Sequence, residues 1–317
     1  MALHPLFAPL LPLLALLPVL TGQDGGQQAS ETDVIATDGD RHARMTVPVR
    51  LGVHGPFNFL IDTGSQNTAI STRVAERMAL KPSSRAKLIG VVGTAMVDMV
   101  ELEQIDLGRR SFYGLLAPLL DAGDMGADGI IGLDSLQGQR VLVDFRRDLI
   151  AVNDAKTLGG NRGFEIVVTA RRRSGQLIMT DAVLDGVRVE VVIDTGAETS
   201  IGNRALQLAM KRRHSPQGTA ELRSVTGQRM LAELGLGRRM KVDDITFRNV
   251  LIAYVDSPAF AALDLNAKPA LLLGMRDLRG FDRVAIDFAS RKVFFDVPEG
   301  AMDGGVRSWS GADPSQR

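Results

Sequence analysis

The feature that most constrains this chain is an internal repeat, in which three sequence blocks recur in the same order. The paired blocks are residues 59–65 and 191–197, residues 88–96 and 222–230, and residues 130–145 and 272–288. The offset between the two copies is nearly constant. A single block could recur by chance, but an ordered series indicates two copies of one fold. The chain is therefore expected to form two related lobes.

Turn-forming residues mark the boundaries of these lobes. The segment 154–162, which contains several Asn, Asp and Gly residues, separates the copies. It predicts an N-terminal lobe at residues 40–153 and a C-terminal lobe at residues 163–298. Two further segments rich in Gly and small polar residues are expected to be a linker, residues 23–39, and a disordered tail, residues 299–317.

Short runs of apolar and β-branched residues, separated by Gly-containing turns, indicate a mainly β protein. The clearest strand candidates are residues 45–53, 57–61, 141–145, 166–170, 187–193 and 293–297. Helical patterns are few and brief, at residues 71–78 and 204–212.

Composition excludes several classes of function. Lys and Arg number 37, as do Asp and Glu, so no strong field favours nucleic acid as a partner. The absence of cysteine removes disulfides, thiolate metal sites and Cys nucleophiles together. The four histidines, at positions 4, 42, 54 and 214, lack metal-ligand spacing.

The first residues form an apolar segment that favours export. Residues 6–20 are rich in Leu, contain three prolines, and are followed by polar sequence. This pattern is typical of a secretory signal peptide, expected at residues 1–22, and it is short for a spanning helix. We expect a periplasmic or secreted protein. An uncleaved membrane anchor is the alternative, because the segment contains no Lys or Arg.

An Asp-Thr-Gly motif ends an apolar strand in each copy, at residues 62–64 and 194–196. The Asp carboxylate lies at the C-terminal end of the strand, and the glycine lets the chain turn sharply so that backbone amides come close to that carboxylate. One such motif would indicate only a turn. Two copies after equivalent strands make Asp62 and Asp194 the candidate catalytic residues.

Around these motifs the sequence resembles the pepsin-like and retropepsin-like aspartic proteases, and it is closer to the retroviral type. Residues 194–201 are similar to the retropepsin active-site loop, and residues 62–65 to the pepsin form. The apolar-apolar-Gly elements at residues 130–132 and 272–274 are also similar to that family, and the resemblance spans residues 40–298. It implies two β-barrel lobes in a pseudo-twofold arrangement, with one Asp from each.

The resemblance also implies the chemistry. Two carboxylates within hydrogen-bond reach share one proton, so the ionised member acts as a general base on water and the protonated member as an acid. No metal or cofactor is required. Which of Asp62 and Asp194 holds the proton is not decided by the sequence, because the titration belongs to the pair.

Neighbouring residues take supporting roles by the same resemblance. Thr63 and Thr195 would cross-link the two loops through their hydroxyl groups. Gly64 and Gly196 would present backbone N–H groups to the carboxylates. Ser65 would either bond an outer carboxylate oxygen or serve only as a turn residue; Ala197 has no hydroxyl, so the two aspartates would then differ in setting.

Two glycine-containing segments lie where these proteases carry a mobile β-hairpin, the flap. The first is residues 90–96 and the second residues 224–230. The flap candidates are Gly90, Val91, Val92, Gly93, Val225, Thr226 and Gly227. An ordinary surface hairpin is the alternative. The expected partner is a polypeptide bound as an added strand, and a monomer is expected because both lobes are in one chain.

Two other functions remain open from the sequence. A peptide-binding module of the same fold would keep the lobes without turnover. An actin-type ATPase also carries paired strand-Asp-x-Gly turns, but its fold needs long helices. Few long helices are expected here, and Ala197 lacks the hydroxyl at the second turn.

Overall fold

The computed structural model describes residues 34–36, 38–39, 45–211, 217–298 and 307–310. These residues all belong to the unit Thr32–Arg317. The predicted signal peptide, residues 1–22, and most of the predicted linker and tail lie outside the described residues and stay predictions. No helix within the described ranges combines the length and the apolar character needed to cross a membrane.

The first lobe is built on one β-sheet with three short helices. Its strands are β2 (Asp38–Gly39), β3 (Met45–Leu51), β4 (His54–Ile61), β5 (Ala69–Ser71), β6 (Ser84–Ile89), β7 (Thr94–Leu107), β8 (Arg110–Leu120) and β9 (Gly129–Ile131). Its helices are α1 (Thr72–Arg77), α2 (Ala122–Met125) and α3 (Leu133–Leu136). The sheet order is β2-β3-β4-β9-β5-β8-β7-β6, and β3 also pairs with β7, so the sheet curls toward a barrel.

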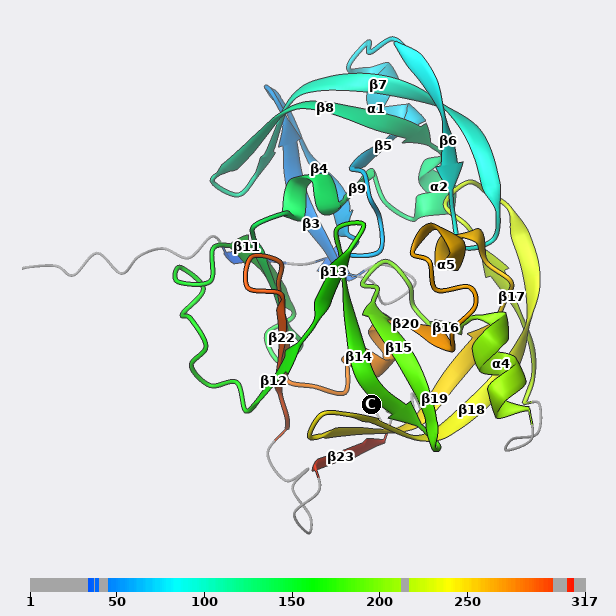
Figure 1. Cartoon of the computed structure of the whole chain (residues 1–317). Coiled ribbons are helices and arrows are strands. Elements are labelled where there is room, and N and C mark those ends of the chain that lie inside the picture. The colour runs from blue at the N-terminus through cyan, green and yellow to red at the C-terminus, as the bar shows by residue number, and fades with distance from the viewer. Residues whose placement is uncertain (1–33, 37, 40–44, 212–216, 299–306, 311–317) are drawn as a thin grey trace, which may run out of the picture. The chain divides into compact units, whose positions relative to one another are not determined.

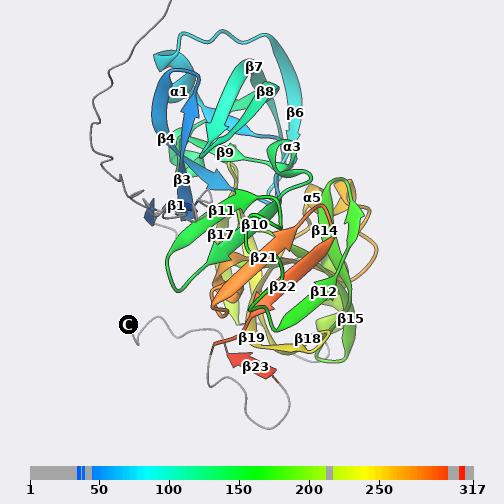
Figure 2. The same cartoon turned by 90° about the vertical axis from the view of Figure 1, so that its left-hand side faces the viewer.

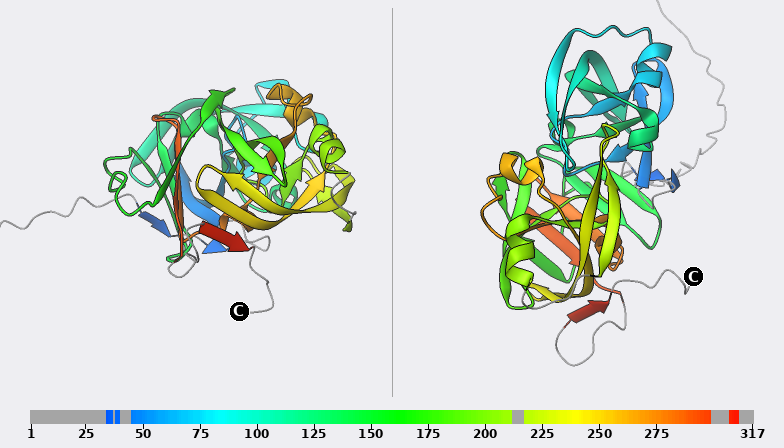
Figure 3. Two further views of the ribbon diagram at one scale, coloured as in Figure 1. Left: turned by 60° about the horizontal axis from the view of Figure 1, so that its bottom comes forward. Right: turned by 90° about the vertical axis from the view of Figure 1, so that its right-hand side faces the viewer.

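The second lobe repeats this plan strand for strand (Figure 1). Its strands are β13 (Arg171–Arg173), β14 (Gln176–Leu184), β15 (Val187–Ile193), β16 (Ser200–Gly202), β17 (Gly218–Arg223), β18 (Arg229–Val242), β19 (Ile245–Tyr254) and β20 (Ala270–Leu273). Its helices are α4 (Arg204–Met210), α5 (Pro258–Ala262) and α6 (Met275–Leu278). The order is β13-β14-β15-β20-β16-β19-β18-β17, and the β14–β18 pairing matches β3–β7. One further strand, β23 (Arg307–Ser310), lies parallel to β19 (Figure 3).

A six-stranded sheet joins the two lobes (Figure 2). It contains β1 (Val34–Ala36), β10 (Arg140–Asp144), β11 (Leu149–Asn153), β12 (Ile166–Thr169), β21 (Arg283–Asp287) and β22 (Lys292–Asp296), in the order β1-β11-β10-β21-β22-β12. At its centre β10 and β21 pair antiparallel, with Leu142 opposite Ala285 at the midpoint. The predicted boundary segment, residues 154–162, lies between β11 and β12.

The mainly β fold with two similar lobes confirms the prediction from the repeat. The longest helix in the described part of the chain is α4, with 7 residues. An actin-type ATPase needs long helices packed on a central sheet, so this fold does not match that alternative.

A buried ion pair fastens the central sheet. Arg140 on β10 is opposite Asp287 on β21, and both side chains are only 2% exposed. The guanidinium donates from Nε and Nη2 to Asp287 Oδ2, at 3.0 and 2.7 Å. It also donates to the backbone carbonyl of Gly160 and to Asn161 Oδ1, and it lies 4.3 Å from the ring centroid of Phe294. The cation is therefore fully paired despite its burial.

We expect Arg140→Leu to lower the free energy of unfolding by about 3–5 kcal/mol, because it leaves the Asp287 carboxylate buried without its partner. Urea denaturation followed by circular dichroism measures this loss. The double variant Arg140→Leu/Asp287→Leu should recover much of it, since no unpaired charge remains. Arg147→Leu is the control, because Arg147 pairs with Asp144 but is 76% exposed. Equal effects of Arg140→Leu and Arg147→Leu would contradict the assignment.

Candidate functional site

Both Asp-Thr-Gly loops leave a buried strand at the same place in the fold. Asp62 follows β4 and Asp194 follows β15, and in each case the last three strand residues are buried. Each of these strands pairs in parallel with an apolar-Gly strand, β9 or β20. The ladder continues one residue further, because Asp62 N donates to Ile131 O and Asp194 N to Leu273 O, both at 3.0 Å. The sheet thus fixes the backbone at both aspartates.

Backbone amides of each loop point at its own carboxylate. Gly64 N and Ser65 N donate to Asp62 Oδ1 at 2.8 and 3.0 Å. Gly196 N and Ala197 N donate to Asp194 Oδ1 at 3.0 and 3.1 Å. The glycine amides therefore lie where the sequence predicts them. Each carboxylate has one oxygen held by two donors, an arrangement that favours the ionised form.

The two threonines bind the loops to each other. Thr63 Oγ1 donates to Ile193 O at 2.8 Å, and Thr195 Oγ1 donates to Ile61 O at 2.6 Å. Each hydroxyl also accepts from the backbone N–H of the opposite threonine, at 3.1 and 3.2 Å. All of these groups are buried. The predicted cross-link is present, and its main bonds run from hydroxyl to the opposite main chain.

The glycine of each loop packs against the carboxylate of the other. A Cβ atom on Gly64 would lie 2.7 Å from Asp194 Cγ, and one on Gly196 would lie 2.3 Å from Asp62 Cγ. Neither distance is possible between non-bonded carbons, so only glycine fits. The contacts bring the two aspartates, 132 positions apart in sequence, to one interface.

Burial and the neighbouring charge alter the acidity of this pair. Asp194 is 6% exposed, whereas Asp62 is partly buried. Burial raises the pKa of Asp194 most, and the Asp62 charge raises it further. Hydrogen bonds from the Gly196 and Ala197 amides lower it, and the resulting pKa is about 8. A side-chain hydrogen bond with Asp62 also raises the pKa. Such a pair retains one proton at a pH where isolated carboxyl groups have lost theirs.

The Ser65 hydroxyl does not bond the carboxylate. It donates to the carbonyl oxygen of Asn67 at 2.9 Å, so the structure supports the turn role. The contact to Asp62 comes from the Ser65 backbone N–H, and Ala197 supplies the same group to Asp194. The two carboxylates therefore receive equivalent backbone hydrogen bonds. They differ in burial, and the missing hydroxyl of Ala197 makes no difference to their hydrogen bonding.

Sequence reasoning missed one contact to the first loop. Gln176, the first residue of β14 in the second lobe, donates from Nε2 to the carbonyl oxygen of Gly64 at 2.6 Å. This bond anchors the loop from the opposite lobe. A glutamine beside a Ser-Gly turn carries no pattern that would single it out in the sequence.

Both flap candidates form hairpin turns. The first flap hairpin is β6 and β7 with the turn at residues 90–93, closed by a bond of 2.8 Å from Gly90 N to Gly93 O. The second flap hairpin is β17 and β18 with the turn at residues 224–228, which contains Thr226 and Gly227. Their tips touch, because Gln228 Nε2 donates to Thr94 O at 3.2 Å.

The tip valines cross between the lobes. Val91 of the first flap hairpin packs against an apolar cluster of the second lobe that includes Val192 and Leu272. Val225 of the second packs against a cluster of the first lobe that includes Leu60 and Ile130. Val92 is also buried. Each hairpin is thus held partly by the opposite lobe.

Within the described residues, no group of three or more His, Cys, Asp or Glu side chains is placed to hold a metal ion. The arrangement of two carboxylates and backbone amides is suited to proton transfer without one.

Two protein-family models match the chain, one in each half. The gag-polyprotein aspartyl protease model matches residues 47–138, and the aspartyl protease model matches residues 180–276. Each match contains one Asp-Thr-Gly motif and one apolar-Gly strand. No individually curated protein matches the sequence significantly.

We expect Thr63→Val and Thr195→Val each to destabilise the protein by about 1–3 kcal/mol, because a buried carbonyl and a buried N–H both lose their partner. The measurement is the free energy of unfolding in urea. Thr63→Ser and Thr195→Ser are matched controls that keep the hydroxyl and should lose less. If the valine and serine variants were equally stable, the cross-link would not contribute.

Proposed function

The chain belongs to the retropepsin-like aspartyl proteases, with one family domain in each half, and on this basis we propose that it is an aspartic endopeptidase. Asp62 and Asp194 would form the catalytic dyad. The observation that carries the proposal is the packing of each carboxylate against the glycine of the opposite loop. It holds two acids at one buried interface, where a single chain supplies both halves of the site.

The proposed mechanism uses the shared proton. The ionised carboxyl removes a proton from a bound water, whose oxygen bonds to the carbon of the scissile carbonyl. The protonated carboxyl donates to the carbonyl oxygen, which gives a neutral gem-diol. The carboxyl that took the proton from water then donates it to the amide nitrogen, while one gem-diol hydroxyl gives its proton to the other carboxylate. The C–N bond breaks, a carboxylic acid and an amine are released, and the pair again holds one shared proton. The amides of Gly64, Ser65, Gly196 and Ala197 hold the carboxyl groups in place.

The proposed substrate is a polypeptide in extended form. A strand-like peptide satisfies its backbone groups by pairing with adjacent strands, and the two flap hairpins present strand edges and apolar tips for this purpose. We further propose that the enzyme acts as a monomer, because one chain contributes both aspartates.

Cleavage of casein or of a peptide library by the purified protein tests the proposal directly. Inhibition by pepstatin or a retropepsin inhibitor should accompany it. A protein that binds such peptides without cleaving them would instead be the non-catalytic module of the same fold.

The two aspartates should behave as one catalytic unit. Asp62→Asn and Asp194→Asn should each reduce kcat by several orders of magnitude, and the double variant should be scarcely worse than either single variant. Single-turnover cleavage of a fluorogenic peptide measures the losses. Asn is nearly isosteric with Asp, so folding and binding of the uncleaved peptide should survive. Strictly additive losses in the double variant would contradict a shared dyad.

Activity should be lost as pH rises through about 8. The pKa of Asp194 is raised to about 8 by burial and by the Asp62 charge. The general acid is present below this value and ionises above it. The measurement is kcat/KM against pH in buffers of constant ionic strength, with circular dichroism to confirm folding at each point. A profile that stays flat into strong alkali would rule out a retained proton.

A further inference from the structure

The two flap hairpins are equivalent in topology but differ at one matched position. In the first hairpin, the last residue pair before the turn is Ile89 on β6 opposite Thr94 on β7. In the second hairpin, it is Arg223 on β17 opposite Arg229 on β18. Ile89 and Arg223 are therefore counterparts. An apolar residue occupies the position in the first hairpin, and a cation occupies it in the second.

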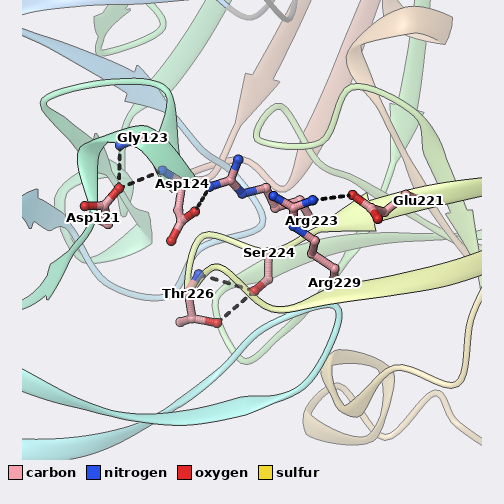
Figure 4. Close-up of polar contacts among 8 residues, drawn as sticks. All are labelled: Asp121, Gly123, Asp124, Glu221, Arg223, Ser224, Thr226 and Arg229. Carbon is pink, nitrogen blue, oxygen red and sulfur yellow. Dashed lines mark hydrogen bonds and ion pairs between the residues drawn. The ribbon is translucent and has the colours of Figure 1, made fainter.

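Arg223 forms an ion pair with the first lobe (Figure 4). Its Nη2 donates to Asp124 Oδ1 on α2. Arg223 is 47% exposed and Asp124 is 13% exposed. The acid is thus mostly enclosed, and it belongs to the opposite lobe from the hairpin that carries the arginine.

The backbone of Asp124 is held by the cap of its helix, and its carboxylate touches the turn of the second hairpin. Asp121 caps α2, since its Oδ1 accepts from Gly123 N at 2.8 Å and from Asp124 N at 3.2 Å (Figure 4). The turn of the second hairpin lies against the same carboxylate, because a Cβ on Gly227 would be 2.6 Å from Asp124 Oδ2. Asp124 therefore contacts both the strand end and the turn of this hairpin.

The cation opposite Arg223 in the hairpin has an acidic partner of its own, so it does not compete with Arg223 for Asp124. This cation is Arg229, which pairs with Glu221 of the same hairpin at 3.1 Å. The turn is braced internally, because the Ser224 and Thr226 hydroxyls are hydrogen-bonded at 2.8 Å and Thr226 N donates to Ser224 Oγ at 3.3 Å (Figure 4). These hydrogen bonds stiffen the turn, so the ion pair at the end of β17 also restrains the residues of the turn.

The first hairpin has no such tie in the part of the chain that the structure describes. Its ion pair, between Arg85 and Asp98, lies within the hairpin itself. Ile89 is 48% exposed. This hairpin meets the second lobe through the packing of Val91, the hydrogen bond that Thr94 O accepts from Gln228, the close approach of Gly90 and Gly93 to the turn of the second hairpin, and the contact of β6 with α5. These contacts are packing and one hydrogen bond, without the ion pair that Arg223 makes.

We propose that Arg223 and Asp124 form a latch that holds the second flap hairpin on the first lobe, so that the first hairpin opens more readily to admit substrate. Both are positioning residues. The part of the proposal that concerns substrate rests on the proposed protease function, whereas the latch itself does not. Because an ion pair with a half-exposed cation is screened by salt, the second hairpin should loosen at high ionic strength.

Hydrogen–deuterium exchange of the full-length protein tests the latch without any activity. Arg223→Gln and Asp124→Asn should each raise exchange of the amides in residues 218–230 by about two- to fivefold, as expected for loss of an ion pair whose cation is half-exposed. Residues 84–96 should change less. Arg223→Lys should restore part of the protection, and added NaCl should reproduce the loss in the unaltered protein.

Matched variants make the result decisive. Arg229→Gln removes an ion pair internal to the same hairpin and should loosen the turn less than Arg223→Gln. The double variant Arg223→Gln/Asp124→Asn should exchange no faster than either single variant, because one interaction is removed in each. Unchanged exchange in both single variants, equal loosening of both hairpins, or additive effects would each overturn the latch.

Kinetics then address the role in substrate binding. With a cleavable peptide, Arg223→Gln should change KM by about two- to fivefold and leave kcat within a factor of two, because the dyad is untouched. An effect on kcat alone would overturn the positioning role. If the unaltered protein cleaves no peptide, the proposed protease function fails, while the exchange measurement still decides whether the latch exists.

Discussion

The contact between the two Asp-Thr-Gly loops is the constraint on which the rest of the structure depends. It packs two carboxyl groups at one buried interface, and the raised pKa of Asp194 is a sign that the arrangement costs free energy. Opposing bonds prevent the loops from separating, because the hydroxyls of Thr63 and Thr195 each satisfy a buried carbonyl across the interface. Any movement that relieved the carboxyl groups would leave those carbonyls unpaired, at a comparable cost.

The six-stranded sheet supplies the rigid joint behind these loops. Its central strands must pair in one register for Arg140 to lie opposite Asp287. A slip of one residue would bury an unpaired cation and turn the apolar side chains of β10 to the wrong face. Replacing such a pair by apolar residues is often neutral for stability. The Arg140–Asp287 ion pair therefore acts mainly by selecting one strand register, which also sets the placement of the two loops relative to each other.

The sequence predicted the features that are local or repeated. The two-lobe plan and the mainly β class followed from ordered blocks, and the hairpin turns followed from their glycines. The long strands β7, β8, β18 and β19 were not among the predicted strands. In β8 the strand pattern is weakened by Gly114 and Pro118, and in β18 by Gly235 and Gly237, because glycine and proline are unfavourable inside strands. Partners distant in sequence were also missed. Neither the Arg140–Asp287 pair nor the bond from Gln176 to Gly64 has a local pattern, since each is created only when the lobes assemble.

The duplicated halves differ in ways that burial explains. Behind the first loop, the Thr68 hydroxyl donates to Asp134 at 2.6 Å; behind the second, the Ser200 hydroxyl donates to Asp277 at 2.5 Å. The acids occupy different helical positions, yet both copies keep the bond, because a buried polar group must be paired. The exposed flap position carries no such requirement, and there the copies diverge into a latch on one side and an apolar residue on the other. In a symmetric homodimer every substitution occurs in both flaps. A single chain with two copies is free of this restriction, so its two flap hairpins can differ in how strongly they are attached, while the proposed active site takes one aspartate from each half.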